Sequence, residues 1–156
     1  MRAWLVVSAL SLLVLVITLC ATKNTQQTTF IPPEFDASAQ SGVPVLPESW
    51  PYGTAKLGEY ELALATNILL KEKNAYIYFA NLASNDVWMK LRILDSTGKQ
   101  IGESGLIKPN EYLEKVSLQI LPDEEEVTIK VMCYEPGTYH SKGSSQVTLP
   151  MIVVNQ

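Results

Sequence analysis

The chain has 156 residues, with 12 Lys and Arg against 16 Asp and Glu, one His and two Cys. Its formal charge of -4 argues against a nucleic-acid-binding protein, which usually carries a basic face. The length fits one domain with an appendage, and a single His leaves little material for a catalytic or metal centre.

The N-terminal segment, residues 1–23, contains an uncharged apolar run that covers residues 3–22. Twenty residues of helix rise about 30 Å, which matches the hydrocarbon core of a bilayer. We therefore predict a retained transmembrane anchor or signal helix that contacts the membrane and places the rest of the chain outside the cytoplasm. A cleaved signal peptide and a lipoprotein modified at Cys20 are the alternatives, although Leu19 is larger than the residue that usually precedes a lipidated Cys.

Residues 24–55 form a second segment, rich in proline, serine, threonine and glutamine. Five of the chain's nine prolines lie in it: Pro32, Pro33, Pro44, Pro47 and Pro51. Because proline fixes φ and lacks a backbone N–H, neither a helix nor a central strand can continue through this stretch. We predict a Pro-rich extracytoplasmic linker that lifts the following domain off the membrane. Its aromatic residues are candidates to dock on that domain: Phe30, Phe35, Trp50 and Tyr52.

The C-terminal segment, residues 56–156, alternates apolar and polar residues with a period of two. Turn residues separate the alternating runs, which cover residues 60–64, 75–81, 87–94, 100–107, 112–118, 127–134 and 147–154. Such alternation is typical of strands with one packed face and one solvated face. About seven short strands in this length predict an all-β domain, an immunoglobulin-like β-sandwich.

The same alternation predicts which side chains of each run face the core. For two central runs these are Val87, Met89, Leu91 and Ile93, and Val127, Ile129, Val131 and Cys133. For the last run they are Val147, Leu149, Met151 and Val153. Pro150 interrupts that last run, so we expect an edge strand or a bulge there.

Residues 76–118, with the later strand VTIKVMCYEP, resemble a family of small exported or membrane-anchored proteins of Gram-positive bacteria, often encoded near conjugative or other mobile elements. The matching pieces are turns and core positions: Asn81, Asp95–Gly98, Gly105–Pro109 and Val131–Tyr134. The resemblance implies an envelope location and a sandwich fold. It implies no catalytic residues.

The residue types that usually carry chemistry are sparse. His140 lies in a loop without a partner nucleophile motif, which favours a solvated surface residue over a catalytic one. Cys133 lies within a strand and is most simply a small core residue. We therefore predict no enzyme activity and no cofactor.

Acidic residues offer the remaining candidates for a metal site. The run Asp123–Glu126 cannot direct all four carboxylates to one ion, so we interpret it as a solvated turn that blocks edge association. Asp86 with Asn85, and Asp95 with Ser96, are weaker candidates for a calcium site. We predict no metal centre.

One surface feature favours binding. In an immunoglobulin-like topology the runs 87–94 and 127–134 are neighbours, so their outward residues share a face. These residues are Trp88, Lys90 and Arg92 on one strand and Lys130, Met132 and Tyr134 on the other. Aromatic residues, Met and Arg are enriched at interfaces, although Lys and Arg stems also cover aromatic rings on ordinary solvated sheets. Trp50 and Tyr52 are candidates to cap this face.

These observations predict a membrane-anchored, extracytoplasmic β-sandwich module that binds a protein partner in the cell envelope without catalysis. The alternative is a carbohydrate or cell-wall binding module in which Trp88 and nearby aromatic rings stack on sugars.

Overall fold

The computed structural model describes residues 30–154. The chain divides into two compact units, Met1–Ile31 and Pro32–Gln156, and nearly all of the second is described. The predicted N-terminal anchor or signal helix, residues 1–23, lies outside the described residues. No helix in residues 30–154 is long and apolar enough to cross a membrane.

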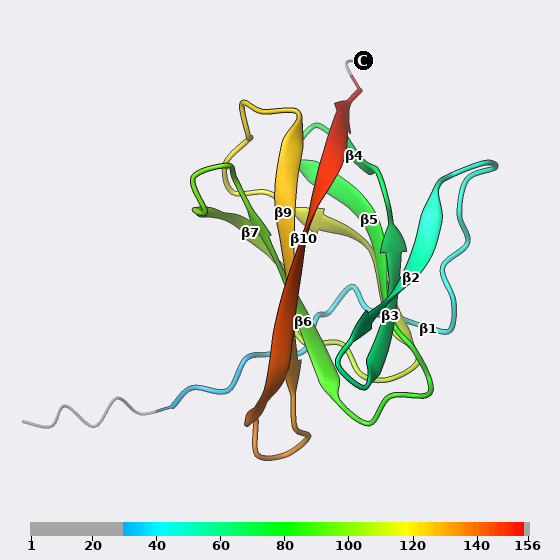
Figure 1. The fold of residues 1–156 in the computed structure, drawn as a ribbon, viewed down its shortest axis with the longest axis vertical. Coiled ribbons are helices and arrows are strands. Elements are labelled where there is room, and N and C mark those ends of the chain that lie inside the picture. Colours follow the sequence, from blue (N-terminus) through cyan, green and yellow to red (C-terminus); the bar gives the residue numbers. More distant parts are fainter. Residues whose placement is uncertain (1–29, 155–156) are drawn as a thin grey trace, which may run out of the picture. The chain divides into compact units, whose positions relative to one another are not determined.

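The described part of the chain is all-β (Figure 1). Its ten strands are β1 (Gln40–Ser41), β2 (Tyr52–Leu57), β3 (Tyr60–Ala65), β4 (Ile68–Lys71), β5 (Asn74–Asn81), β6 (Trp88–Leu94), β7 (Gln100–Glu103), β8 (Glu111–Ser117), β9 (Glu126–Tyr134) and β10 (Ser141–Val153). Each of the seven alternating runs overlaps one of these strands, although β10 begins six residues before its run. β1, β2 and β4 are additional, because short or Pro-flanked strands carry too few residues to show a period.

The strands form one curled sheet in the order β1-β8-β5-β4-β10-β9-β6-β7, and β3 joins it by pairing with β5 and β2. We call β1 to β5 with β8 the first section, and β10, β9, β6 and β7 the second section. β10 connects them: its N-terminal part is antiparallel to β9, and its C-terminal part is parallel to β4. Figure 1 shows β10 as a long strand that runs the full height of the molecule.

Pro150 marks the point where β10 passes from one section to the other. It is the last residue of β10 in register with β9, opposite Glu126, and Met151 is the first in register with Ile68 of β4. Because proline has no backbone N–H to donate, it suits a position where a strand leaves one partner for another.

Both sections contribute to a single hydrophobic core. The side chains of Val87, Met89, Leu91 and Ile93 are at most 1% exposed, as the alternation in this run predicts. The four inward residues predicted for β9 are also buried. In β10 only Leu149 and Met151 are buried, whereas Val147 and Val153 are about half exposed, because they lie on either side of the short stretch where β10 crosses the core.

Two buried asparagines fix the turn between β5 and β6. The Asn81 side-chain amide donates to the carbonyls of Val87 (2.8 Å) and Ile107 (3.3 Å). Asn85 donates to Asn81 Oδ1 (2.7 Å) and accepts from the backbone N–H of Glu61 (2.9 Å). These bonds hold β6 in position relative to β3 and β5, because breaking them would leave buried polar groups unpaired.

The folded unit begins well before residue 56, the boundary expected from composition. β1 pairs with β8, and β2, which starts at Tyr52, forms a hairpin with β3. Residues 34–36 run beside residues 105–106, with Asp36 N donating to Leu106 O (2.9 Å) and Leu106 N donating to Glu34 O (2.8 Å). Proline can flank such short edge pairings without entering them, so a Pro-rich segment can still lie against a sheet.

Candidate binding face on strands β6 and β9

The six predicted patch residues lie in three cross-strand pairs on the outer face of the second section. β6 and β9 are antiparallel neighbours, with Trp88 opposite Tyr134, Lys90 opposite Met132 and Arg92 opposite Lys130. Directly opposed side chains in an antiparallel pair lie on the same face, so the register brings all six together. We call this surface the β6–β9 face.

An aromatic cluster forms one end of the β6–β9 face. The Trp88 ring contacts Phe35 edge-on, with centroids 4.8 Å apart, and Tyr139 in a tilted arrangement, with centroids 5.3 Å apart. The Lys108 ammonium lies 4.8 Å from the centroid of the Phe35 ring, within the range of a cation–π contact. Each ring of the cluster remains partly exposed.

Met132 forms the floor of the face next to this cluster. Its side chain is only 8% exposed, although it lies on the outer face of β9. The Tyr134 hydroxyl donates to Met132 Sδ at 3.7 Å. Met132 therefore acts as a packed base for the partly exposed side chains around it.

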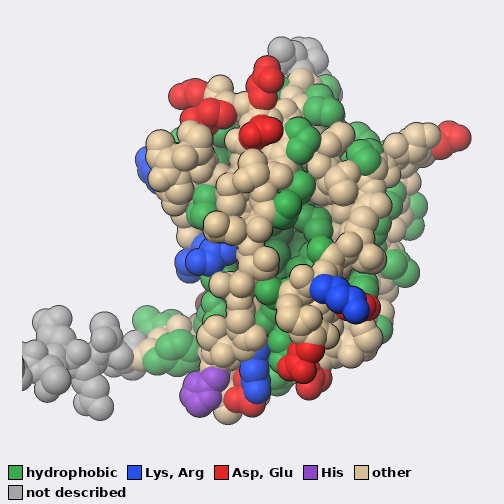
Figure 2. Space-filling model, in the orientation of Figure 1, with side chains coloured by type: hydrophobic (Ala, Val, Ile, Leu, Met, Phe, Trp, Pro, Cys, Tyr) green, Lys and Arg blue, Asp and Glu red, His purple; other side chains and the backbone are tan. Residues whose placement is uncertain are grey.

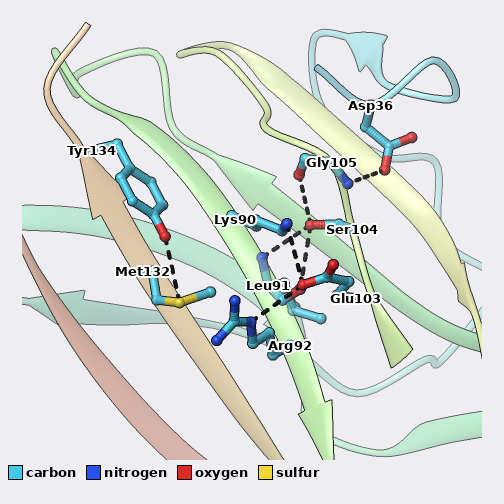
Figure 3. A network of polar contacts seen from close by, with 9 residues as sticks. All are labelled: Asp36, Lys90, Leu91, Arg92, Glu103, Ser104, Gly105, Met132 and Tyr134. Atoms are coloured by element: carbon cyan, nitrogen blue, oxygen red, sulfur yellow. Dashed lines mark hydrogen bonds and ion pairs between the residues drawn. The ribbon is translucent and has the colours of Figure 1, made fainter. Parts of the chain in front are cut away.

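Glu103 of β7 pairs with two of the three cations on this face (Figure 3). Its Oε2 atom lies 3.1 Å from Lys90 Nζ and 3.2 Å from Arg92 Nε. Burial alone would raise the pKa of the Glu103 carboxyl, but the hydrogen bonds and positive charges of Lys90 and Arg92 outweigh it and lower that pKa below 4.5.

Lys130 has a like charge directly across the strand pair, since it lies opposite Arg92. On its other side it lies opposite Gln146 of β10, a neutral residue. Like charges directly opposite each other in a sheet are unfavourable. Three cations against one carboxylate leave this face positive on a chain whose net charge is -4. Figure 2 shows acidic side chains at both ends of the side of the molecule that it draws.

A shallow groove of about 440 Å³ borders the face at β7. Its lining residues are Glu34, Phe35, Asp36, Ala37, Lys90, Glu103, Ser104 and Gly105. Asp36 Oδ2 accepts from the backbone N–H of Gly105 at 2.8 Å, so the segment before β1 forms one wall (Figure 3). Burial would raise the pKa of Asp36, but hydrogen bonds from Ser38 and Gly105 lower it overall.

Three residues of this site do not follow from the strand pattern: Phe35, Glu103 and Tyr139. Phe35 comes from the Pro-rich segment and contacts Trp88, whereas Tyr52 begins β2 opposite Ala65 in the first section. Tyr139 lies in the β9–β10 loop with φ of 59°. Glu103 has no local signal, because strict alternation after buried Ile101 would turn it inward. The irregularity in the β6–β7 pairing instead places it opposite Arg92, on the side of the β6 cations.

The other candidate residues lie apart from this face or are inaccessible. His140 is exposed, with Nδ1 3.6 Å from Glu135 Oε2. Cys133 is buried in the core, and burial raises the pKa of its thiol to about 11. Asp95 Oδ1 accepts from the N–H groups of Thr97 and Lys99, which occupies the carboxylate in a turn.

Among the described residues, no group of three or more His, Cys, Asp or Glu side chains could hold a metal ion. The acidic run Asp123–Glu126 is exposed at the start of β9, where three of its members line a pocket of about 590 Å³. Asn85 is engaged in the turn network described above.

The sequence matches no known family model and no curated protein.

Proposed function

We propose that this chain is a membrane-anchored, extracytoplasmic module whose β6–β9 face binds a protein partner of the cell envelope in a non-enzymatic role. The observation that carries the proposal is the gathering of the Phe35–Trp88–Tyr139 cluster, the Met132 floor and three cations on one face of an acidic protein. Aromatic residues, Met and Arg are the side chains most enriched where proteins meet.

The finer architecture of the proposal is an immunoglobulin-like β-sandwich. Two sections of a mostly antiparallel sheet share one core, and β6 and β9 are neighbours as that topology requires. The anchor is argued from the length and apolarity of residues 3–22. An envelope location is part of the same proposal, because such an anchor would place the described residues outside the cytoplasm.

A protein partner suits the geometry better than a sugar. Stacking on a sugar requires an open ring face, whereas the Trp88 ring is contacted from two directions by Phe35 and Tyr139. Cations and a mixed apolar floor around a partly buried ring fit the centre of a protein interface.

The test is crosslinking of the full-length protein in cells, followed by identification of the captured molecules. Trp88→Ala and Arg92→Ala are each expected to reduce the specific crosslinked protein by about tenfold or more, because truncation at an interface anchor costs at least about 1.4 kcal/mol. The matched control is Tyr76→Ala with Lys115→Ala, an aromatic–cation pair on the first section with 5.6 Å between the ammonium and the ring centroid.

Thermal melting of each variant would show that the fold is intact. Crosslinks that survive both β6–β9 substitutions would contradict the proposal. Capture of wall polysaccharide in place of a protein would support the carbohydrate-binding alternative instead.

A further inference from the structure

β10 presents a free edge along most of its length. Residues 141–148 are all exposed, and they pair with β9 on one side only. On the other side, pairing within the described residues begins at Met151, where β10 meets β4. Figure 1 shows this edge on the front of the molecule.

The alternation of ladder bonds identifies which backbone groups point away from β9. Met151 N donates to Glu125 O at 2.7 Å, so odd-numbered residues of this part of β10 bond to β9. The hydrogen bonds of β6 support the same assignment. Met89 exchanges hydrogen bonds with Ile107 on the side away from β9, so the even-numbered residues of β6 are the ones that bond to β9. The N–H and C=O groups of Ser144, Gln146 and Thr148 therefore point outward along the free edge.

This edge lacks the usual protection against strand addition. Edge strands are commonly blocked by Lys, Pro, a bulge or an inward charge. The irregularity in β10 lies between Ser141 and Gly143, and Pro150 belongs to the same outward-pointing set as Gln146. Between these two points, residues 144–149 contain no charge and no proline.

We propose that this edge accepts an extended segment of the partner protein as an additional strand beside β10. The inference rests on the proposed function, since it specifies how the partner of the β6–β9 face is held. Main-chain hydrogen bonds to a sheet edge supply affinity, and alternate side chains of the added strand supply specificity.

Charge determines what the outward side chains of the added strand should be. Gln146 lies in one row with Lys130 and Arg92, and Glu103 is already paired with Arg92 at the far end of that row. An added strand would lie two strand spacings, about 10 Å, from β9, within the combined reach of a lysine and a glutamate side chain. Acidic side chains at these positions would relieve the unbalanced charge of Lys130.

The inward side chains of the added strand should be apolar. Val147 points to the core side of β10 but is 45% exposed, because no strand among residues 30–154 covers it. Figure 2 shows hydrophobic side chains in a hollowed strip down the middle of this face, between the positions of β10 and the β2–β3 hairpin. The preferred segment therefore alternates apolar and acidic residues.

The test uses the full-length protein in detergent and a fluorescent synthetic peptide that alternates valine or threonine with glutamate. Gln146→Pro removes one outward N–H without touching the β9 ladder, and it is expected to weaken peptide binding by about tenfold. Gln146→Ala keeps that N–H and is the matched control, with a change expected within about threefold. The same peptide with lysine for glutamate should bind more weakly to the wild type.

A second measurement keeps the proposal falsifiable if Gln146→Pro impairs folding. In the wild type, peptide binding should slow hydrogen exchange at the amides of Ser144, Gln146 and Thr148. The amide of Val147, already bonded to β9, should change little. Binding without this alternation would overturn the proposal.

Three further outcomes are decisive. Equal binding by the Gln146→Pro and Gln146→Ala variants would contradict strand addition, even if Trp88→Ala abolishes the cellular crosslink. Sedimentation as a dimer that Gln146→Pro disrupts would contradict it as well, because the occupant would then be a second copy. Peptide binding that depends on the Gln146 N–H, with crosslinks unaffected by Trp88→Ala, would support strand addition and contradict the proposed function.

Discussion

At the scale of single residues, Glu103 holds the cations of the β6–β9 face in place. One oxygen contacts both Lys90 and Arg92, and the Lys90 side chain is only 13% exposed. A mostly buried ammonium needs a charge partner, because burial of an unpaired charge is unfavourable. Glu103 therefore both orients the two cations and reduces the charge that they offer to a partner.

We expect Glu103→Gln to lower the free energy of unfolding at neutral pH by about 1 kcal/mol, as for a partly exposed ion pair. The folded-state pKa of Glu103 lies below its ordinary value of 4.5, so its stabilisation is present above pH 4.5 and is lost as the pH falls through the lower folded value. The wild type should therefore lose stability more steeply than Glu103→Gln below pH 4.5.

Denaturant unfolding at a series of pH values would measure this difference. Glu114→Gln, a substitution of an exposed acid on β8, is the control. Its free energy of unfolding should change with pH in parallel with that of the wild type. Parallel curves for Glu103→Gln and the wild type would show that this ion pair does not contribute to stability.

At the scale of elements, the segment at residues 34–36 completes the binding face. It lies beside residues 105–106 through backbone hydrogen bonds, which place the Phe35 ring against Trp88. The approach is close: a Cβ atom on Gly105 would lie 2.5 Å from the backbone N of Asp36. Only glycine permits this contact, so Gly105 determines whether the segment can dock.

We expect Gly105→Ala to lower the free energy of unfolding by about 1–3 kcal/mol and to displace the segment, because a backbone atom cannot move aside as a side-chain tip can. If the segment is displaced, Phe35→Ala should lower the free energy of unfolding much less in the Gly105→Ala background than in the wild type. A double-mutant cycle by denaturant unfolding measures this coupling.

Gly53→Ala is the control for this cycle, because a Cβ at Gly53 would meet only the Thr66 methyl group at an ordinary 3.6 Å. If the losses of unfolding free energy caused by Gly105→Ala and Phe35→Ala are additive, the two residues do not act through the same contact.

At the scale of the whole molecule, β10 joins the two sections into one unit. Its last residues pair in parallel with β4, and Met151 is 5% exposed in the shared core. No other strand of the described chain pairs with both β4 and β9. Loss of this short stretch would remove that pairing and leave the shared core and the bridge between Gly102 and Leu118 to join the sections.

We expect deletion of residues 151–156 to lower the free energy of unfolding by about 4 kcal/mol or more, from the lost burial of Met151 and the lost ladder with β4. Calorimetry of this truncated protein and of the wild type measures the loss, and equal midpoints would contradict a joining role for β10.

The alternation of apolar residues by itself determined seven of the ten described strands and most of their inward side chains. A period of two is a local property, so it predicts Val87 to Ile93 and Val127 to Cys133 as buried without knowledge of any partner strand. The outward set of the β6–β9 face follows from the same period, once the two strands are taken as neighbours.

Only the tertiary structure decided the extent of burial in β10, the docking of the Pro-rich segment and the pairing of Glu103. Val147 and Val153 fit the pattern of inward residues but are exposed, because burial depends on which strand lies opposite. Phe35 and Glu103 reach the face through contacts between segments far apart in the chain. A local pattern carries no information about such contacts, because they depend on register, sheet curvature and the close approach at Gly105.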